Sequence, residues 1–320
     1  MKVFVTREIL PAGLKLLKAH HDVDVWEDYA PPAYDVLLNK VKDCDGIVTM
    51  LSDKIDTGVI DAAKNLKVIS QLAVGYDNID VNYATSKKIY VTNTPDVLTE
   101  SSADFSFALL MAIARRVVEA DKYVRRGNWK VAWHPTMMLG GELYGATLGI
   151  VGAGRIGRAM ARRAKGFNMN ILYTSRSAKP EFEKECGAKR VELDELLRQS
   201  DYVSLHVPLT NETKGLINAD KLALMKKTGY LISNARGPVI DETALYQALK
   251  GNKIAGAALD VFCKEPASSD NPLFSLDNIV VAPHISSAGT ATREKMSVMV
   301  AENIIAALSG NKPKNRLNNF

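Results

Sequence analysis

The sequence predicts an α/β protein made of two doubly wound parallel-sheet domains. Short β-branched runs alternate with segments of helical spacing along almost the whole chain, which is typical of a parallel sheet with crossover helices. A glycine-rich turn follows an apolar run near the middle of the chain. The 320 residues give room for about two domains, and 47% hydrophobic and 24% charged residues are ordinary globular values.

The first domain is expected to span residues 1–99 and to be flavodoxin-like. Its predicted helices lie at 11–19 and 59–63, and its predicted strands lie at 2–6, 23–26, 45–50, 68–72 and 90–92. The last segment, 286–320, is expected to return to this domain through an amphipathic helix at 290–308. We therefore predict a discontinuous substrate-binding domain.

The second domain is expected to span residues 100–285. A helix capped at Thr99 or Ser101 should run to about residue 126, and its segment FALLMAIARRVV is apolar enough to be buried at a domain or subunit boundary. Further helices are expected at 181–185, 193–198, 222–225 and 244–249. Strands are expected at 148–151, 170–173, 202–206, 230–233, 255–260 and 278–282.

The strand at 148–151 leads directly into three glycines and a helix. Gly152 permits the tight turn, Gly154 lets a pyrophosphate approach backbone N–H groups, and Gly157 lets the helix lie close to the strand. The helix N-terminus supplies unpaired donors and a positive dipole end. This order of elements predicts a Rossmann-type dinucleotide-binding domain, and a tight turn without a nucleotide is the alternative.

Three polar side chains follow neighbouring strands of this second domain: Arg236, Glu265 and His284. Because parallel strands end at the same edge of a sheet, we expect them in one crevice between the domains. The Arg236 guanidinium suits a planar carboxylate, and His284 can exchange a proton with a carbonyl oxygen. Glu265 would fix the tautomer of His284 and favour its imidazolium form. The expected chemistry is hydride transfer with His284 as the proton donor.

Two loops of the first domain also follow strands. Leu51 and Ser52 come after one strand, and Val74 and Gly75 come after another, where an α/β sheet can bind a ligand or form an ordinary turn. A loop with Trp129 and Trp133 precedes the glycine motif; it can reach a substrate or pack at an oligomer interface.

The cofactor is expected to be NADP(H), with NAD(H) possible. After the strand at 170–173 the sequence has Ser175, Arg176 and Ser177, with no carboxylate to pair with a free ribose 2′-hydroxyl. Serine hydroxyls and an arginine can bind a 2′-phosphate instead. A solvated loop that accepts either cofactor is the alternative.

The chain resembles the D-isomer-specific 2-hydroxyacid dehydrogenases over essentially its whole length, and most closely their glyoxylate and hydroxypyruvate reductases. The shared runs are AVGYDNID at 73–80, VTNTPDVLT at 91–99, VGAGRIG at 151–157, NARGPVID at 234–241, AALDVFCKEP at 257–266 and APHISSA at 282–288. The resemblance implies reduction of glyoxylate to glycolate and of hydroxypyruvate to D-glycerate. Another D-2-hydroxyacid dehydrogenase, or a non-enzymatic nucleotide-sensing corepressor, is the alternative.

The resemblance also implies the site residues. The catalytic set is Arg236, Glu265 and His284. The expected substrate-binding set is Leu51, Ser52, Val74, Gly75, Trp133, Arg236 and His284, with Trp133 reaching its own or a neighbouring subunit's site. The expected cofactor-binding set is Gly152, Gly154, Arg155, Ile156, Gly157, Ser175, Arg176, Ser177, Val207, Pro208, Asn234, Ala235, Arg236, Asp260, His284 and Ser286. Ser286 is a departure, since many relatives have glycine there.

Composition excludes several other classes. The net charge of +5 is scattered, which suits small anions better than nucleic acid. The three cysteines, Cys44, Cys186 and Cys263, have no metal-ligand spacing, so we expect no metal and a cytoplasmic location. No apolar run is long enough for a membrane span, and no signal peptide is expected. The apolar helix predicts a homodimer.

Overall fold

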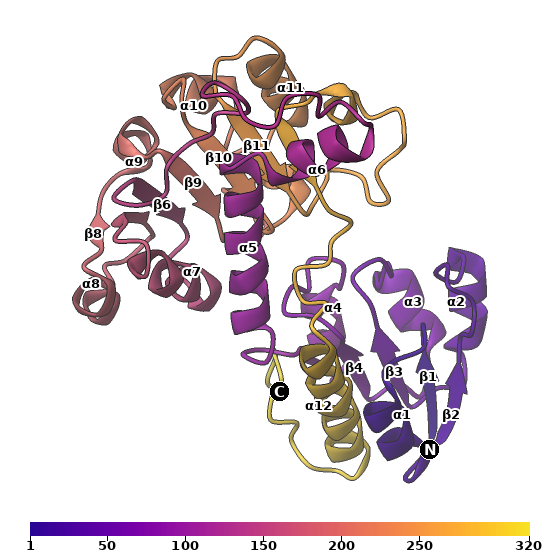
Figure 1. Cartoon of the computed structure of the whole chain (residues 1–320). Coiled ribbons are helices and arrows are strands. Elements are labelled where there is room, and N and C mark those ends of the chain that lie inside the picture. The colour runs from indigo at the N-terminus through magenta and orange to yellow at the C-terminus, as the bar shows by residue number, and fades with distance from the viewer. The chain divides into compact units, whose positions relative to one another are not determined.

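The computed structural model describes all 320 residues and divides them into two compact units. Unit 1 comprises Met1–Leu98 and Ser287–Phe320, and unit 2 comprises Thr99–Ser286. Each unit has a central sheet in which every strand pairing is parallel (Figure 1). The predicted fold class is confirmed.

Unit 1 contains a five-stranded sheet with the order β2-β1-β3-β4-β5, the flavodoxin-like order. Helices α2, α3 and α4 cover one face, and α1 and α12 cover the other. The strands are β1 (Lys2–Val5), β2 (Asp22–Val25), β3 (Gly46–Thr49), β4 (Val68–Gln71) and β5 (Tyr90–Thr92). The helices are α1 (Pro11–Lys18), α2 (Tyr34–Lys40), α3 (Thr57–Ala62), α4 (Val81–Ser86) and α12 (Thr290–Leu308).

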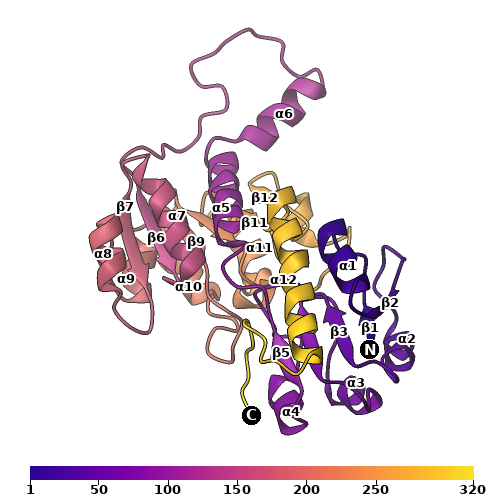
Figure 2. The same cartoon turned by 90° about the horizontal axis from the view of Figure 1, so that it is seen from below.

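Helix α12 brings the end of the chain back to the first strands. Its buried residues Val300 and Ile304 pack with Val3 and Val5 of β1 in one apolar cluster. It lies along α1 in both views (Figures 1 and 2). The sequence-based expectation for this helix, residues 290–308, matches its bounds. Helices α2 and α4 were not predicted, because each has a single buried apolar residue, Leu37 and Ala84, and so no clear helical periodicity.

Unit 2 contains a seven-stranded sheet with the order β12-β11-β10-β9-β6-β7-β8. The first six strands in chain order have the dinucleotide-binding order, with β6 between β7 and β9, and β12 extends the sheet. The strands are β6 (Thr147–Val151), β7 (Asn170–Thr174), β8 (Lys189–Arg190), β9 (Tyr202–Leu205), β10 (Tyr230–Ser233), β11 (Gly256–Leu259) and β12 (Ile279–Val281).

Helices cover both faces of this sheet. Helices α5, α7 and α8 pack with Leu148 and Ile150 on one face, and α9, α10 and α11 pack with Val203 and Leu205 on the other. The α-helices are α5 (Thr99–Ala114), α6 (Val117–Arg125), α7 (Arg155–Lys165), α8 (Pro180–Cys186), α9 (Leu193–Gln199), α10 (Ala219–Leu224) and α11 (Glu242–Lys250). Two short 3₁₀ helices lie at Gly237–Val239 and Pro272–Ser275.

The predicted single helix from Thr99 to about residue 126 is wrong, because the structure divides it into α5 and α6. The carbonyl of Ala114 accepts the N–H of Gly141, at 2.9 Å, instead of a helical donor. Arg116 then adopts a left-handed conformation with φ of 53°. The apolar run is buried only in part: Leu110 lies in the core of unit 2, whereas Val117 is 53% exposed.

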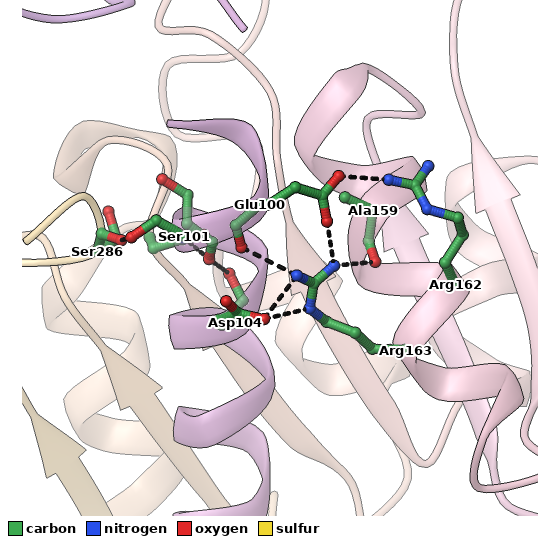
Figure 3. A network of polar contacts seen from close by, with 10 residues as sticks. Glu100, Ser101, Asp104, Ala159, Arg162, Arg163 and Ser286 are labelled. Carbon is green, nitrogen blue, oxygen red and sulfur yellow. Dashed lines mark hydrogen bonds and ion pairs between the residues drawn. The ribbon is translucent and has the colours of Figure 1, made fainter. Parts of the chain in front are cut away.

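An ion-pair network holds α5 against α7 (Figure 3). Arg163 donates to Asp104 at 2.7 Å and to Glu100 at 2.9 Å, and Arg162 also donates to Glu100. The Ser101 hydroxyl donates to the Ser286 carbonyl at 3.3 Å. The helix begins at Thr99 itself, so both predicted capping residues, Thr99 and Ser101, lie in its first turn and neither is the cap. Because several charges act together, the network fixes α7 more firmly than one exposed ion pair would.

Helix α6 and the loop after it extend away from the sheet of unit 2, as Figure 2 shows. The loop carries exposed aromatic and aliphatic side chains, among them Trp129, Trp133 and Leu139. None of the helices combines the length and the apolar character that crossing a membrane requires.

Candidate active site

The predicted catalytic residues follow three adjacent strands at the carboxyl edge of the unit 2 sheet. Arg236 follows β10, Glu265 comes after β11, and His284 follows β12. Asp260, a predicted cofactor residue, directly follows β11. The order β12-β11-β10 places these strand ends side by side. The sheet topology therefore gathers their side chains at one edge, as the sequence predicts.

His284 and Glu265 are in direct contact. The Nδ1 atom of His284 lies 2.7 Å from Oε2 of Glu265, and Oε1 of Glu265 accepts the backbone N–H of Phe262 at 2.9 Å. Burial raises the pKa of Glu265, but the hydrogen bond and charge of His284, the Phe262 N–H and the charge of Arg236 together bring it below its usual value. Glu265 is thus held as a carboxylate against one ring nitrogen, and Nε2 remains for a substrate.

Asp260 holds the segment that carries His284. Its carbonyl accepts the N–H of His284 at 2.9 Å, and its two carboxylate oxygens accept the N–H groups of Ile285 and Ser286, each at 2.8 Å. The Asp260 side chain is fully buried, and burial raises its pKa despite these bonds and the charge of His284. His284 has a φ of 55°, a conformation that a residue with a side chain adopts only when its surroundings impose it. Asp260 supplies that restraint.

Arg236 completes the group. It leaves β10 in an extended conformation, and its Nη1 atom donates to the carbonyl of Ala235 at 2.9 Å. Its charge contributes to the lowered pKa of Glu265, so the guanidinium lies within electrostatic reach of the Glu265 and His284 pair. Arg236, Glu265 and His284 are therefore brought together in one unit.

The glycine turn has the geometry of a diphosphate cradle. Gly152 has a φ of 101°, and a Cβ atom there would lie 2.7 Å from the carbonyl oxygen of His206. A Cβ on Gly157 would lie 2.3 Å from the Gly152 carbonyl, whereas nothing lies within 4 Å of one on Gly154. Gly154 caps α7, so the open side faces the helix N-terminus. The turn fits a dinucleotide.

The other predicted cofactor residues lie around this edge. Arg155 and Ile156 begin α7, and Val207 and Pro208 follow β9. Asn234 directs its side-chain amide to the carbonyl of Ser102 on α5, at 3.1 Å, which anchors the segment before Arg236. Ser286 is buried, and its backbone is bonded to Asp260 and Ser101.

The loop after β7 is more basic than the sequence analysis expected. Ser175 donates its hydroxyl to the Ser177 carbonyl at 2.7 Å, and Arg176 is exposed. Arg190 donates to the Ser175 carbonyl at 3.0 Å, and Lys179 donates to the Ser177 hydroxyl at 3.0 Å. Neither Lys179 nor Arg190 is among the cofactor-binding residues predicted from the sequence. Arg190 lies on the two-residue strand β8, whose register against Tyr173 of β7 no sequence pattern indicates.

Glu212 lies within electrostatic reach of the same loop. Its pKa is lowered mainly by the hydrogen bond from Thr210, and Arg176 adds a smaller contribution. The loop therefore carries three cations close to one another, Arg176, Lys179 and Arg190, with one carboxylate near Arg176.

The predicted substrate loops belong to unit 1. Leu51 and Ser52 lie in the turn after β3, and Val74 and Gly75 follow β4. The Asn93 amide donates to the Val74 carbonyl at 2.9 Å and fixes that loop.

Two further side chains of unit 2 are Trp133 and His206. Trp133 is 76% exposed in the loop after α6. His206 lies just after β9 with Nε2 2.9 Å from the Ser204 hydroxyl, and burial lowers its pKa to about 4. It is therefore neutral near pH 7.

Comparison with known proteins identifies the family of this chain. The model of the D-isomer specific 2-hydroxyacid dehydrogenase NAD binding domain matches residues 107–286. The chain belongs to this family. The glyoxylate reductase of Korarchaeum cryptofilum is 57% identical to this dehydrogenase over 317 residues, covering 99% of this chain and 96% of that protein. The predicted family and the predicted enzyme class, a nicotinamide-dependent oxidoreductase that acts on CH–OH groups, are confirmed.

Solved structures with high TM-scores have the same fold as this dehydrogenase. The TT0316 protein of Thermus thermophilus has a TM-score of 0.94 and 44% identity, covering 99% of this chain and 100% of that one. The NADPH-dependent glyoxylate/hydroxypyruvate reductase of Sinorhizobium meliloti, solved with NADP and malonate, has a TM-score of 0.86 and 34% identity, covering 99% and 96%.

Proposed function

We propose that this dehydrogenase reduces glyoxylate to glycolate, and hydroxypyruvate to D-glycerate, with a nicotinamide cofactor. The observation that carries the proposal is the His284 and Glu265 pair beside Arg236, at the sheet edge that also holds the glycine turn. The 57% identity to a glyoxylate reductase supports this choice of substrate over other 2-oxo acids.

Each residue of the site has a distinct role in the proposed reaction. Arg236 binds the substrate carboxylate through its planar N–H donors. His284 donates a proton from Nε2 to the carbonyl oxygen, while Glu265 holds Nδ1–H and balances the positive ring. The bound reduced nicotinamide supplies the hydride. Proton donation converts the developing alkoxide into the hydroxyl group of the product. Asp260 holds the backbone segment that carries His284 throughout.

We also propose that NADP(H) is preferred and that NAD(H) is accepted. Arg176, Lys179 and Arg190 surround the loop after β7, and the Ser177 hydroxyl, which accepts from Lys179, can donate its hydrogen to a 2′-phosphate. A carboxylate that would pair with a free 2′-hydroxyl is missing from the positions directly after β7. The related Sinorhizobium meliloti enzyme, which was solved with NADP, agrees with this preference.

Leu51, Ser52, Val74, Gly75 and Trp133 keep their predicted role in substrate binding as part of this proposal. The enzyme is proposed to be a cytoplasmic homodimer, and its three cysteines are unpaired thiols. Support for the dimer comes from the exposed apolar side chains of α6 and the loop after it, since monomeric proteins rarely expose so many together. They are Val117, Val124, Trp129, Val131, Trp133, Leu139 and Tyr144.

Initial rates with glyoxylate, hydroxypyruvate and pyruvate, each with NADPH and with NADH, test the proposal directly. We expect glyoxylate with NADPH to have the highest kcat/KM. A higher value for pyruvate would indicate another D-2-hydroxyacid dehydrogenase. Folded protein that binds the nucleotide but turns over none of the three acids would favour a nucleotide sensor.

A further inference from the structure

A cation that the catalytic group does not include lies at the carboxyl edge of the unit 1 sheet. Arg7 follows β1, and its Nη2 atom donates to the hydroxyl of Ser52 and to Oδ1 of Asp53, the latter at 3.0 Å. The Arg7 side chain is 18% exposed and that of Asp53 is 1% exposed. A nearly buried ion pair therefore supports the exposed Ser52.

The carboxylate of this ion pair is fixed from several sides. The Thr6 hydroxyl and the N–H of Met50, at 2.7 Å, donate to Oδ2 of Asp53. The Asn78 amide donates to the carbonyls of Met50 and Asp53 at 3.0 Å and 2.7 Å. These hydrogen bonds fix the turn that carries Ser52. The Asp53 carboxylate, held in this way, fixes the Arg7 guanidinium.

The direction of the bond between Arg7 and Ser52 has a chemical consequence. A serine hydroxyl has one hydrogen to donate and two lone pairs that accept. Because the guanidinium donates to the Ser52 oxygen, the Ser52 hydrogen must be directed to another acceptor, and no residue of the chain accepts it. The adjacent positive charge also makes this hydroxyl a stronger donor to an anion.

We propose that Arg7 is a positioning residue that fixes Ser52 as a hydrogen-bond donor to an oxygen of the substrate carboxylate. This inference rests on the proposed function, which gives Ser52 a contact with the substrate. The ligand class is a small 2-oxo acid anion. Arg7 acts through Ser52, so its contribution requires the Ser52 hydroxyl.

A double-mutant cycle tests this dependence. The variants are Arg7→Met, Ser52→Ala and the double variant, and the measured quantities are kcat and KM for glyoxylate at saturating NADPH. We expect each single variant to raise KM on the order of 10-fold and to lower kcat less. In the Ser52→Ala background, Arg7→Met should change KM by less than about twofold, because the two residues act as one unit.

Three controls make the cycle decisive. Arg7→Lys keeps a cation beside Asp53 and serves if Arg7→Met does not fold. Arg198→Met removes one positive charge from the exposed end of α9 and should leave KM unchanged. NADPH affinity, measured by fluorescence titration, should change less than about twofold in every variant.

One outcome would overturn the inference about Arg7, and a different outcome would overturn the proposed function. If Arg7→Met raises KM by the same factor with and without the Ser52 hydroxyl, Arg7 acts independently of Ser52 and the inference is overturned. A parent enzyme that does not reduce glyoxylate would instead overturn the proposed function.

Discussion

The Nδ1 atom of His284 lies 2.7 Å from the Oε2 atom of Glu265, so one ring nitrogen is committed to a carboxylate and the other remains for the substrate. The backbone that carries the ring is fixed by Asp260, which accepts three successive N–H groups, those of residues 284, 285 and 286. The Asp260 carboxylate therefore orients the backbone, and the Glu265 carboxylate orients the ring.

His284→Ala should lower kcat by a factor on the order of 10² to 10⁴, the usual contribution of a general acid. Binding of NADPH should change little, since the glycine turn and the loop after β7 remain intact. Single-turnover reduction of glyoxylate, with NADPH titration as the control, measures both quantities. A variant with nearly normal kcat would exclude His284 as the proton donor.

Glu265→Gln should lower kcat for glyoxylate reduction by a factor on the order of 10 or more. The parent carboxylate has a lowered pKa, so it is charged throughout the neutral range, and its Oε2 atom holds Nδ1 of His284 at 2.7 Å. A neutral amide keeps the size of the side chain but removes the charge-assisted hydrogen bond that orients the ring. Steady-state kinetics with glyoxylate and NADPH measure kcat. Glu265→Asp, which keeps the charge, is the control, and an unchanged kcat in both variants would contradict the pair's role.

Arg236→Lys should raise the KM for glyoxylate more than it changes NADPH affinity. Lysine keeps the positive charge but loses the planar fork that binds both oxygens of a carboxylate. An increase in KM on the order of 10-fold or more is expected from the lost charge-assisted hydrogen bonds. Equal losses of substrate and cofactor affinity would instead indicate that the whole edge has been disturbed.

The loop after β7 should determine the choice of cofactor. Arg176→Ala should lower kcat/KM for NADPH while leaving that for NADH within about twofold. The reason is that NADPH has a charged 2′-phosphate for Arg176 to bind, whereas NADH has a neutral 2′-hydroxyl. Arg190→Ala should have a smaller effect of the same sign, since part of its role is to bond the Ser175 carbonyl. If the ratio of the two cofactors does not change in either variant, the loop does not bind the 2′-phosphate.

Residues at strand ends can be predicted from the sequence more readily than contacts between residues far apart in the chain. Glycine spacing and apolar runs locate the strand ends that carry Arg236, Asp260 and His284, because a parallel sheet needs continuous apolar strands. The roles of Arg7, Lys179 and Arg190 were missed because their partners are set by register and turn geometry. The division of the long helix at Arg116 also depends on a distant group, the Gly141 N–H.

Protonation of His206 should destabilise the folded enzyme in mild acid. Its pKa is lowered from 6.5 to about 4 by burial, so the unfolded chain binds a proton that the folded chain does not. The stability that this difference contributes is complete above pH 6.5 and is lost as the pH falls toward 4. By linkage, the free energy of unfolding should fall by about 2 kcal/mol between pH 7.5 and pH 5 from this residue. Urea unfolding of the parent and of His206→Gln at both pH values measures the difference. If the variant keeps the full pH dependence of the parent, another group is responsible.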